Sequence, residues 1–183
     1  MKHVILTVGP QCVGKSTFCN KIIQAHPEII LISRDAILME LFGKIYLDKY
    51  SGGHYIALEK MWEKVTEQLQ KDSLIILDCW NDSAEKRKTI TEKLRSLGAQ
   101  RIDAWYFVTP ENTCVKWYMK EVSSEIKTVN PKWGKLQQES MCDQFCRCYE
   151  FFHSQTVDHT QGFDFIKKID PLETPTFEML LRA

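Results

Sequence analysis

The 183-residue sequence has no long apolar run and no net charge, and each absence excludes a class of protein. Its longest apolar stretches, such as Leu74 to Leu77, are far shorter than the roughly 20 residues that span a bilayer. The 24 basic residues balance 24 acidic ones, so the chain lacks the long-range positive field of a non-specific nucleic-acid binder. We therefore expect no membrane span, and a polyanion must be bound by a local site.

The amino terminus also lacks the apolar stretch and the small-residue cleavage site of a signal peptide, which leads us to expect a cytoplasmic protein. Thiols stay reduced in that compartment, so the 7 cysteines are expected to act as small apolar side chains without a disulfide framework. Cys142, Cys146 and Cys148 lack the paired C-x-x-C spacing of zinc knuckles, and we expect no structural zinc.

Internal repeats, low-complexity blocks and long linkers are absent as well, which favours a single domain over residues 1–183. Short runs rich in Val, Ile and Leu alternate with segments of helical periodicity, the pattern of βα units around a parallel sheet. The predicted strands are His3 to Val8, Ile29 to Ile32, Ser73 to Leu77, Ile102 to Val108 and Phe163 to Ile169. We predict an α/β fold with a mostly parallel five-stranded sheet and helices on both faces.

Helices are predicted where apolar residues recur at spacings of three and four. One such set runs from Tyr55 to Leu69, and another from Cys142 to Phe152. A third helix, Ala84 to Leu97, is followed by a glycine suited to its end, and Asp82 or Ser83 can cap its start.

The most specific motif follows the first predicted strand, where the sequence satisfies G-x-x-x-x-G-K-[ST] ahead of a helix. It comprises Gly9, Pro10, Gln11, Cys12, Val13, Gly14, Lys15, Ser16 and Thr17. The two glycines allow backbone amides to converge on phosphate oxygens, and the helix adds the positive end of its dipole. Lys15 is expected to reach the β and γ phosphates, and the Ser16 hydroxyl to hold Mg²⁺ between them. The motif predicts binding of a purine nucleoside triphosphate.

Two further predicted strands end in an acidic residue. Asp35 follows an apolar strand whose carboxyl end lies at the ligand-binding edge of a parallel sheet, so it can accept a proton from an attacking hydroxyl; the alternative is that it caps the helix Ala36 to Phe42. Asp78 follows Leu74 to Leu77 and is expected to hold Mg²⁺ opposite Ser16; the alternative is an ordinary turn-starting aspartate.

Together, the P-loop, Ser33-Arg34-Asp35 and Asp78-Cys79-Trp80-Asn81 resemble the polynucleotide-kinase-like and zeta-toxin-like branch of the P-loop kinases, with an AAA-type P-loop. The resemblance implies a P-loop NTPase/kinase fold with a helical lid, in which Asp35 is the general base toward the acceptor hydroxyl. It also assigns Lys15 to the phosphates and Ser16 to magnesium. The sequence departs from the family at Leu38, where an arginine near the acceptor phosphate is common.

The resemblance places the lid at approximately residues 111–152, where family members carry arginines that reach the γ phosphate. Here the candidate cations are Lys116, Lys120 and Arg147. A mobile lid over a triphosphate needs positive charge, although a solvated helix and loop would have the same composition. The interleaved aromatics Trp117, Tyr118 and Trp133 are expected to pack rather than to stack on a base.

We therefore predict a kinase, an enzyme that transfers the γ-phosphoryl group of ATP, with Mg²⁺, to an alcohol group. The acceptor is a small molecule or a nucleic-acid 5′ end bound near Asp35, beside a flexible flap over Ala36 to Tyr55. Neutral charge and Leu38 favour the small molecule, whereas the motifs favour the nucleic acid. The alternative is a nucleotide-dependent switch that hydrolyses ATP slowly and phosphorylates no acceptor.

Overall fold

The computed structural model describes residues 1–45, 51–129, 135–173 and 180, and their side chains except those of residues 121–129 and 135–139. The strands are β1 (His3–Val8), β2 (Ile30–Ser33), β3 (Leu74–Asp78), β4 (Arg101–Phe107) and β5 (Phe165–Ile169). The helices are α1 (Lys15–Ala25), α2 (Arg34–Phe42), α3 (Gly53–Gln70), α4 (Ala84–Ser96), α5 (Glu111–Val129) and α6 (Lys135–His153), with a short 3-10 helix, η1 (His159–Gln161).

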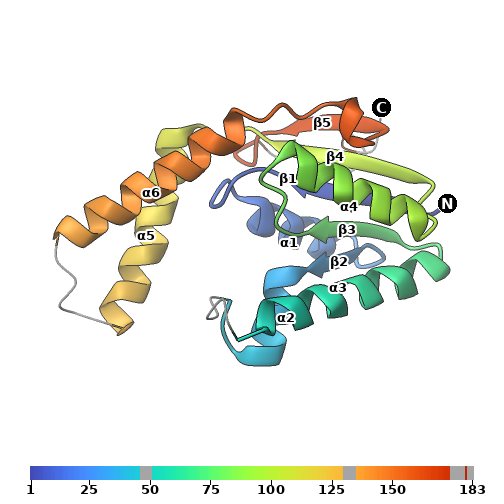
Figure 1. Ribbon diagram of the computed structural model, residues 1–183, viewed down its shortest axis with the longest axis horizontal. Coiled ribbons are helices and arrows are strands. Elements are labelled where there is room, and N and C mark those ends of the chain that lie inside the picture. The colour runs from blue at the N-terminus through green and yellow to red at the C-terminus, as the bar shows by residue number, and fades with distance from the viewer. Residues whose placement is uncertain (46–50, 130–134, 174–179, 181–183) are drawn as a thin grey trace.

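The five strands form one parallel sheet in the order β2-β3-β1-β4-β5 (Figure 1). The predicted α/β fold with a five-stranded parallel sheet is confirmed. The central strand β1 is buried along its whole length, as expected for a strand covered on both faces. The predicted bounds are close to the observed ones, and the last strand begins at Phe165 because Phe163 packs into the core without joining the ladder.

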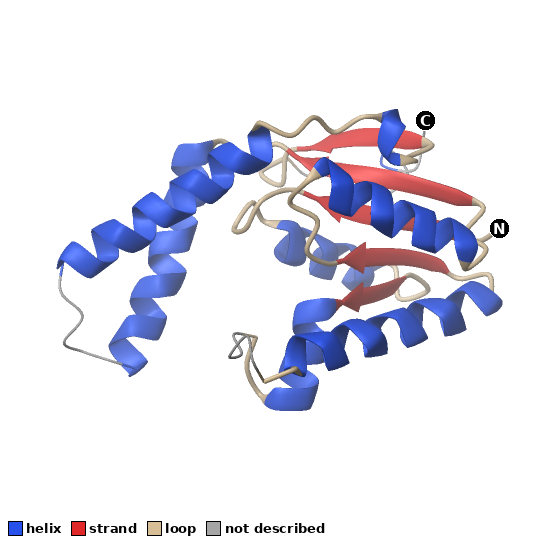
Figure 2. Cartoon of the chain, in the orientation of Figure 1, coloured by secondary structure: helices blue, strands red, loops and turns tan. Residues whose placement is uncertain are grey.

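Helices cover both faces of the sheet, as predicted (Figure 2). Because successive residues of a strand point to opposite faces, the core divides into two clusters. Val4 and Leu6 of β1 pack on the side of α3 and α4, whereas Ile5 packs on the side of α1 and the start of α5. The two layers hold the sheet rigidly behind the loops that follow its strands.

Local sequence signals set the bounds of α4 and α3. Ser83 is the N-cap of α4 and its hydroxyl accepts from the Lys86 amide, which decides between the two caps expected there. The helix predicted from Tyr55 to Leu69 is present as α3, but its buried face is Ala57, Met61, Val65 and Leu69, and Tyr55 is exposed. The residues of that face repeat every four positions, so one helix side packs on the sheet.

The segment from Ala36 to Tyr55, expected to be a flexible flap, contains the ends of two helices. Gly43, with φ of 69°, caps the carboxyl end of α2, and Gly52, with φ of 71°, precedes α3. Both positions need the left-handed conformation that glycine adopts without strain. Residues 46–50 lie outside the described part of the chain. The described parts of the segment are therefore mostly helical rather than loop.

Helices α5 and α6 lie alongside each other and project beyond the sheet (Figure 1). They coincide with the predicted lid at residues 111–152, whose connection, residues 130–134 with Trp133, lies outside the described residues. Near the base of the pair, Tyr118 stacks on Phe145 with ring centroids 4.6 Å apart. Tyr118 therefore packs against another side chain of the helix pair, as we expected from the sequence.

A buried charged cluster lies at the amino-terminal ends of β1 and β4, at the opposite edge from the P-loop. His3 Nε2 lies 2.8 Å from Asp103 Oδ2, and Arg101 Nε donates to the same carboxylate at 2.9 Å. Burial raises the pKa of the Asp103 carboxyl, but the hydrogen bonds from His3 and Arg101 outweigh burial and leave that pKa below its ordinary value. The ionised carboxylate therefore stabilises the fold.

Across the ranges described above, no helix is both long and apolar enough to cross a membrane. The seven cysteines are all free thiols.

Candidate active site

The sheet order brings the three sequence motifs to one edge. Strand β3 lies between β1 and β2, and its Asp78 pairs in register with Ser33 at the end of β2. Because parallel strands point the same way, the loops that follow β1, β2 and β3 emerge side by side, at the edge where open α/β sheets bind ligands.

A cavity of about 670 Å³ lies between these loops. Most of the P-loop lines it, together with residues that follow β2 and β3 and residues near the start of α3. The lining comprises Gly9, Pro10, Gln11, Cys12, Gly14, Lys15, Ser16, Thr17, Arg34, Asp35, Ile45, His54, Asp78, Cys79, Trp80, Asn81 and Asp82. The predicted phosphate, magnesium and base residues thus share one cavity, except that Val13 is buried behind it.

The P-loop needs glycine at both of its specified positions, for two different reasons. A Cβ on Gly9 would lie 2.9 Å from Val13 Cγ2 and 3.2 Å from Phe107 Cβ, so the loop could not keep its path. Gly14 has φ of 91° and directly precedes α1, where only glycine is free of strain. The positive φ of Gly14 turns the chain into α1. The backbone amides in the first turn of α1, which have no partner within the helix, lie at the end of α1 that borders the cavity.

Lys15 extends back over its own loop. Its Nζ donates to the carbonyl oxygens of Gly9 at 2.8 Å and Pro10 at 2.7 Å. Burial lowers the pKa of Lys15 below its usual value, and the neighbouring Asp78 carboxylate opposes this change. The ammonium is thereby held at the mouth of the P-loop, within the cavity.

Ser16 and Asp78 are joined directly. The Ser16 hydroxyl donates to Asp78 Oδ2 at 3.1 Å, and the buried Thr7 hydroxyl donates to Oδ1 of the same carboxylate at 2.7 Å. Thr7 lies on β1, next to β3, so the strand pairing itself fixes the carboxylate. Sequence reasoning did not include Thr7, because nothing in the local pattern of β1 marks this hydroxyl as the partner of a residue 71 positions away.

This pair fits a magnesium ion by its donor chemistry. Mg²⁺ prefers oxygen ligands and takes one or two from the protein, with water and phosphate oxygens supplying the rest. A site of this kind needs no cluster of acidic or imidazole side chains, and within the described ranges no three His, Cys, Asp or Glu side chains are grouped to hold a metal. Ser16 and Asp78 stay the predicted ligands.

Asp35 lies in the first turn of α2 with its side chain 55% exposed. The alternative that it caps this helix is wrong, since α2 begins at Arg34 and the N-cap is Ser33, whose hydroxyl accepts from the Ala36 amide. Instead Asp35 accepts from its neighbour, with Arg34 Nη2 at 2.6 Å and Nε at 3.0 Å. The Asp35 carboxylate therefore does not cap the helix, and it borders the cavity.

The loop after β3 is held by two residues, of which sequence reasoning singled out only Asn81. Asn81 is buried and donates to the carbonyl oxygens of Thr7 at 2.7 Å and Cys79 at 2.9 Å. Its own carbonyl accepts from the fully buried Arg87 at 3.0 Å. The other nitrogens of Arg87 donate to Gln161 Oε1 and to the Thr156 carbonyl, both at 2.6 Å. Asn81 is thus a structural residue of the cavity wall.

The carbonyl of Val13 at the back of the P-loop is held by a residue that follows β4, the neighbour of β1 on the side away from β3. Thr109, which follows β4, donates its hydroxyl to this carbonyl at 2.7 Å. The Thr109 carbonyl in turn accepts from Tyr149 of α6 at 2.8 Å, and burial raises the pKa of Tyr149 to about 12. The phenol therefore stays a donor at neutral pH.

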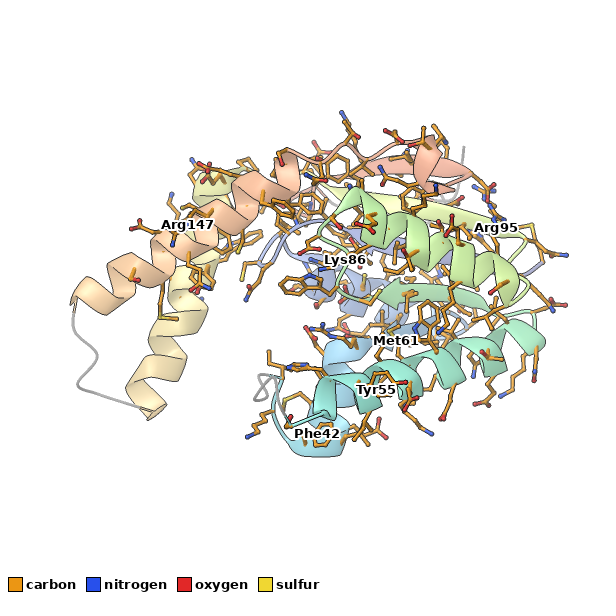
Figure 3. The ribbon with its side chains drawn as sticks, viewed as in Figure 1. Phe42, Tyr55, Met61, Lys86, Arg95 and Arg147 are labelled. Carbon is orange, nitrogen blue, oxygen red and sulfur yellow. The ribbon has the colours of Figure 1, made fainter. Side chains whose placement is uncertain are left out.

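The three candidate cations of the predicted lid do not line the cavity. Lys116 and Lys120 are exposed on α5. Arg147 is exposed on α6, in the part of that helix that projects beyond the sheet (Figure 3). Their assignment to the phosphates stays a prediction.

The fold is shared with several solved structures of low sequence identity. One is from the PezAT chromosomal toxin-antitoxin system of Streptococcus pneumoniae, with a TM-score of 0.60 and 14% identity over 93% of this chain and 70% of that one. Another is a fungal RNA kinase, with a TM-score of 0.52 and 15% identity over 92% of this chain and 74% of that one.

A third is from a Pnkp1/Rnl/Hen1 complex, with a TM-score of 0.55 and 20% identity over 62% of this chain. The match covers only 38% of the chain in that structure, so the likeness concerns one part of a larger protein. No curated protein matches. The expected resemblance to P-loop kinases of this branch is confirmed at the level of the fold.

One family comparison covers more than half of the sequence, from β1 through α5. Because residues 4–129 match the AAA domain family, and the P-loop, Asp78 and the strands β2, β3 and β4 lie within that match, the chain belongs to the AAA domain family.

Proposed function

We propose that the protein is an ATP- and Mg²⁺-dependent kinase that transfers the γ-phosphoryl group to a hydroxyl of a small molecule or a nucleic-acid 5′ end. The observation that carries the proposal is the shared cavity, in which Lys15 and Ser16 of the P-loop face Asp78 and Asp35. The fungal RNA kinase with the same fold supports a phosphotransferase over other nucleotide-binding functions. We further propose that residues 1–183 act as one domain with α5 and α6 as its lid.

The arrangement assigns separate tasks to its residues. The P-loop amides and the Lys15 ammonium would neutralise the β and γ phosphates, which is the main source of catalysis in phosphoryl transfer. Ser16 and Asp78 would hold magnesium, which would offset the negative charge of the phosphates. Asp35, exposed to the cavity, would orient the acceptor hydroxyl and accept its proton.

The test is transfer of label from γ-labelled ATP to a panel of 5′-hydroxyl oligonucleotides, nucleosides and metabolites. Lys15→Ala is expected to abolish detectable transfer, and Asp35→Asn to slow it by about 10²- to 10⁴-fold while ATP still binds. Lys21→Ala, an exposed lysine on the same helix outside the cavity, is the matched control for charge. Asp143→Asn, exposed on α6, serves the same purpose for the carboxylate.

Two results would contradict the proposal in different places. Full transfer by Asp35→Asn would remove Asp35 from the role of base and leave the kinase activity standing. Hydrolysis of ATP with no labelled acceptor across the panel would replace the kinase by the nucleotide-dependent switch.

A further inference from the structure

The peptide bond between Val13 and Gly14 has its carbonyl held from outside the P-loop. Helix α1 begins at Lys15, and the Gly14 carbonyl accepts from the Phe18 amide at 3.0 Å as the first acceptor of the helix. The Val13 carbonyl lies one residue earlier and accepts instead from the Thr109 hydroxyl at 2.7 Å, between two residues that are each 1% exposed. The Thr109 hydroxyl therefore fixes the orientation of this peptide group.

The orientation of the peptide group determines where the Gly14 amide points. The bond is trans, and in a trans peptide the N–H and the C=O lie in one plane and point in opposite directions. The Val13 carbonyl points at Thr109, which lies behind the loop. The Gly14 amide therefore points away from Thr109, toward the cavity that Gly14 lines. That cavity is where the phosphate chain of a nucleotide is expected to lie.

The conformation of the P-loop gives this contact a further importance. Val13 stands between two residues with positive φ, Cys12 at 57° and Gly14 at 91°. Left-handed residues curl the backbone so that successive amides converge on an anion, but a residue with a Cβ adopts this conformation at a cost in energy. Such a conformation persists only where surrounding contacts hold it. The curl at Cys12 therefore depends on contacts from outside the loop, and the hydrogen bond from Thr109 is made at the next residue.

The backbone around Thr109 is itself held on two sides. The Val108 amide donates to the carbonyl of Ile169 on β5 at 3.0 Å, and the Thr109 carbonyl accepts from the Tyr149 hydroxyl at 2.8 Å. Threonine is branched at Cβ and has few side-chain rotamers, so a fixed backbone limits the directions that its hydroxyl can take. The Tyr149 hydroxyl thus helps to direct the Thr109 hydroxyl at the P-loop.

Tyr149 is fixed between helix α6 and the sheet. It lies near the end of α6, where that helix meets the strand ends (Figure 1). The centroid of its ring lies 4.3 Å from that of His153 and 6.4 Å from that of Phe145. His153 Nδ1 in turn lies 3.4 Å from the hydroxyl of Tyr106 on β4. Ring contacts along α6 and a polar contact to the sheet therefore hold the Tyr149 hydroxyl at the Thr109 carbonyl.

We propose that Thr109 and Tyr149 are positioning residues of the nucleotide site, which aim the Gly14 amide at the phosphate chain of the bound nucleotide. Neither residue lines the cavity, so both act through the peptide group of Val13 and Gly14 and not by touching the ligand. The inference rests on the nucleotide-binding part of the proposed function and is independent of the acceptor.

The test is binding of ADP with magnesium and of adenosine, followed through the backbone amide of Gly14 in NMR spectra of ¹⁵N-labelled protein. An amide proton that is donated to a phosphate moves to higher frequency, so ADP is expected to shift the Gly14 signal in this way and adenosine is not. Thr109→Val removes the hydroxyl and keeps the shape of the side chain. It is expected to reduce the shift and to weaken ADP binding about 10- to 100-fold, the loss for one hydrogen bond to a charged group. The affinity for adenosine is expected to stay unchanged.

Two conservative variants test the mechanism of the effect. Thr109→Ser keeps the hydroxyl and is expected to restore both the Gly14 shift and the affinity for ADP. Tyr149→Phe keeps the ring and removes a hydroxyl that lies one step further from the ligand, so it is expected to weaken ADP binding about 2- to 10-fold.

Each residue type has a matched control. Thr91→Val removes a hydroxyl that is as buried as that of Thr109 and donates to the Gln161 carbonyl, outside the cavity. Tyr106→Phe removes a tyrosine hydroxyl that contacts His153 and not Thr109. Both controls are expected to bind ADP with the affinity of the wild type.

The outcomes separate this inference from the kinase proposal. Selective loss of ADP affinity in Thr109→Val, in a protein that labels no acceptor, keeps the positioning role and removes the kinase function. Phosphoryl transfer by the wild type, with ADP affinity and Gly14 shift unchanged in Thr109→Val, keeps the kinase function and overturns the positioning role. An equal loss of affinity for ADP and adenosine, or an equal loss in Thr91→Val, indicates general damage to the fold and also overturns it. If Thr109→Val does not fold, Tyr149→Phe decides, and an ADP affinity equal to that of Tyr106→Phe overturns the proposal.

Discussion

Thr7→Val tests whether the hydroxyl of β1 positions the predicted magnesium ligand. Valine has nearly the shape of threonine, so the fully buried position keeps its packing while Asp78 loses the hydrogen bond at 2.7 Å. A hydrogen bond to a charged group contributes about 1.5–3 kcal/mol. Since about 1.4 kcal/mol corresponds to a factor of ten in affinity, we expect magnesium to bind about 10- to 100-fold more weakly.

The assay is calorimetric titration of ATP into the protein at a series of magnesium concentrations. It gives the magnesium concentration at which the affinity for ATP reaches half of its maximum. Thr66→Val is the control, because the Thr66 hydroxyl donates to the Trp62 carbonyl at 2.8 Å within α3, away from the cavity. A magnesium requirement in Thr7→Val equal to that of the wild type and of Thr66→Val would refute the idea that Thr7 orients Asp78 for the ion.

Three further predictions concern stability and the P-loop. The pKa of Asp103 is depressed in the fold, so the contribution of its carboxylate to stability is complete above the unfolded-state pKa of about 4 and is lost as the pH falls through the lower folded-state pKa. Urea midpoints should show this loss of stability below about pH 4, and Asp103→Asn should make the loss smaller. Gly9→Ala should weaken ATP binding at least tenfold because its Cβ would lie 2.9 Å from Val13, whereas Gly43→Ala, with φ of 69° and open space, should cost about 1 kcal/mol of stability and leave ATP affinity intact. Tyr149→Phe removes one donor to the loop behind the P-loop and should lower the free energy of unfolding by about 1 kcal/mol, measured by urea denaturation.

The features of the fold that depend on short sequence signals could be predicted. Strand β1 and the P-loop after it follow from an apolar run and a motif whose glycines each have a geometric reason. Helix α4 follows from its serine cap and from Gly98, which has φ of 96° just beyond the helix. Each signal is contained within about 15 residues, the range over which backbone propensities act.

The features that depend on contacts between distant segments could not be predicted. Asp35 is of a residue type that favours the N-cap, but Ser33 takes that position because α2 begins at Arg34, two residues before the predicted Ala36. Arg87 has the appearance of an exposed residue on a helix rich in lysine, and only the fold surrounds it with Gln161, Thr156 and Asn81. Charge pattern alone cannot reveal this buried guanidinium, because two of its acceptors are backbone carbonyl oxygens, which every residue carries, and the third is the uncharged side chain of Gln161.

These distant contacts connect the helix pair α5–α6 to the cavity at both of its ends. At the start of the pair, Thr109 holds the Val13 carbonyl of the P-loop. Beyond its end, the Thr156 carbonyl accepts from Arg87, which holds the loop after β3 through Asn81. None of the three predicted lid cations, Lys116, Lys120 and Arg147, lines the cavity. The segments that flank the helix pair therefore also hold the P-loop, through Thr109, and the loop after β3, through Arg87, because the same short segments carry both sets of hydrogen bonds.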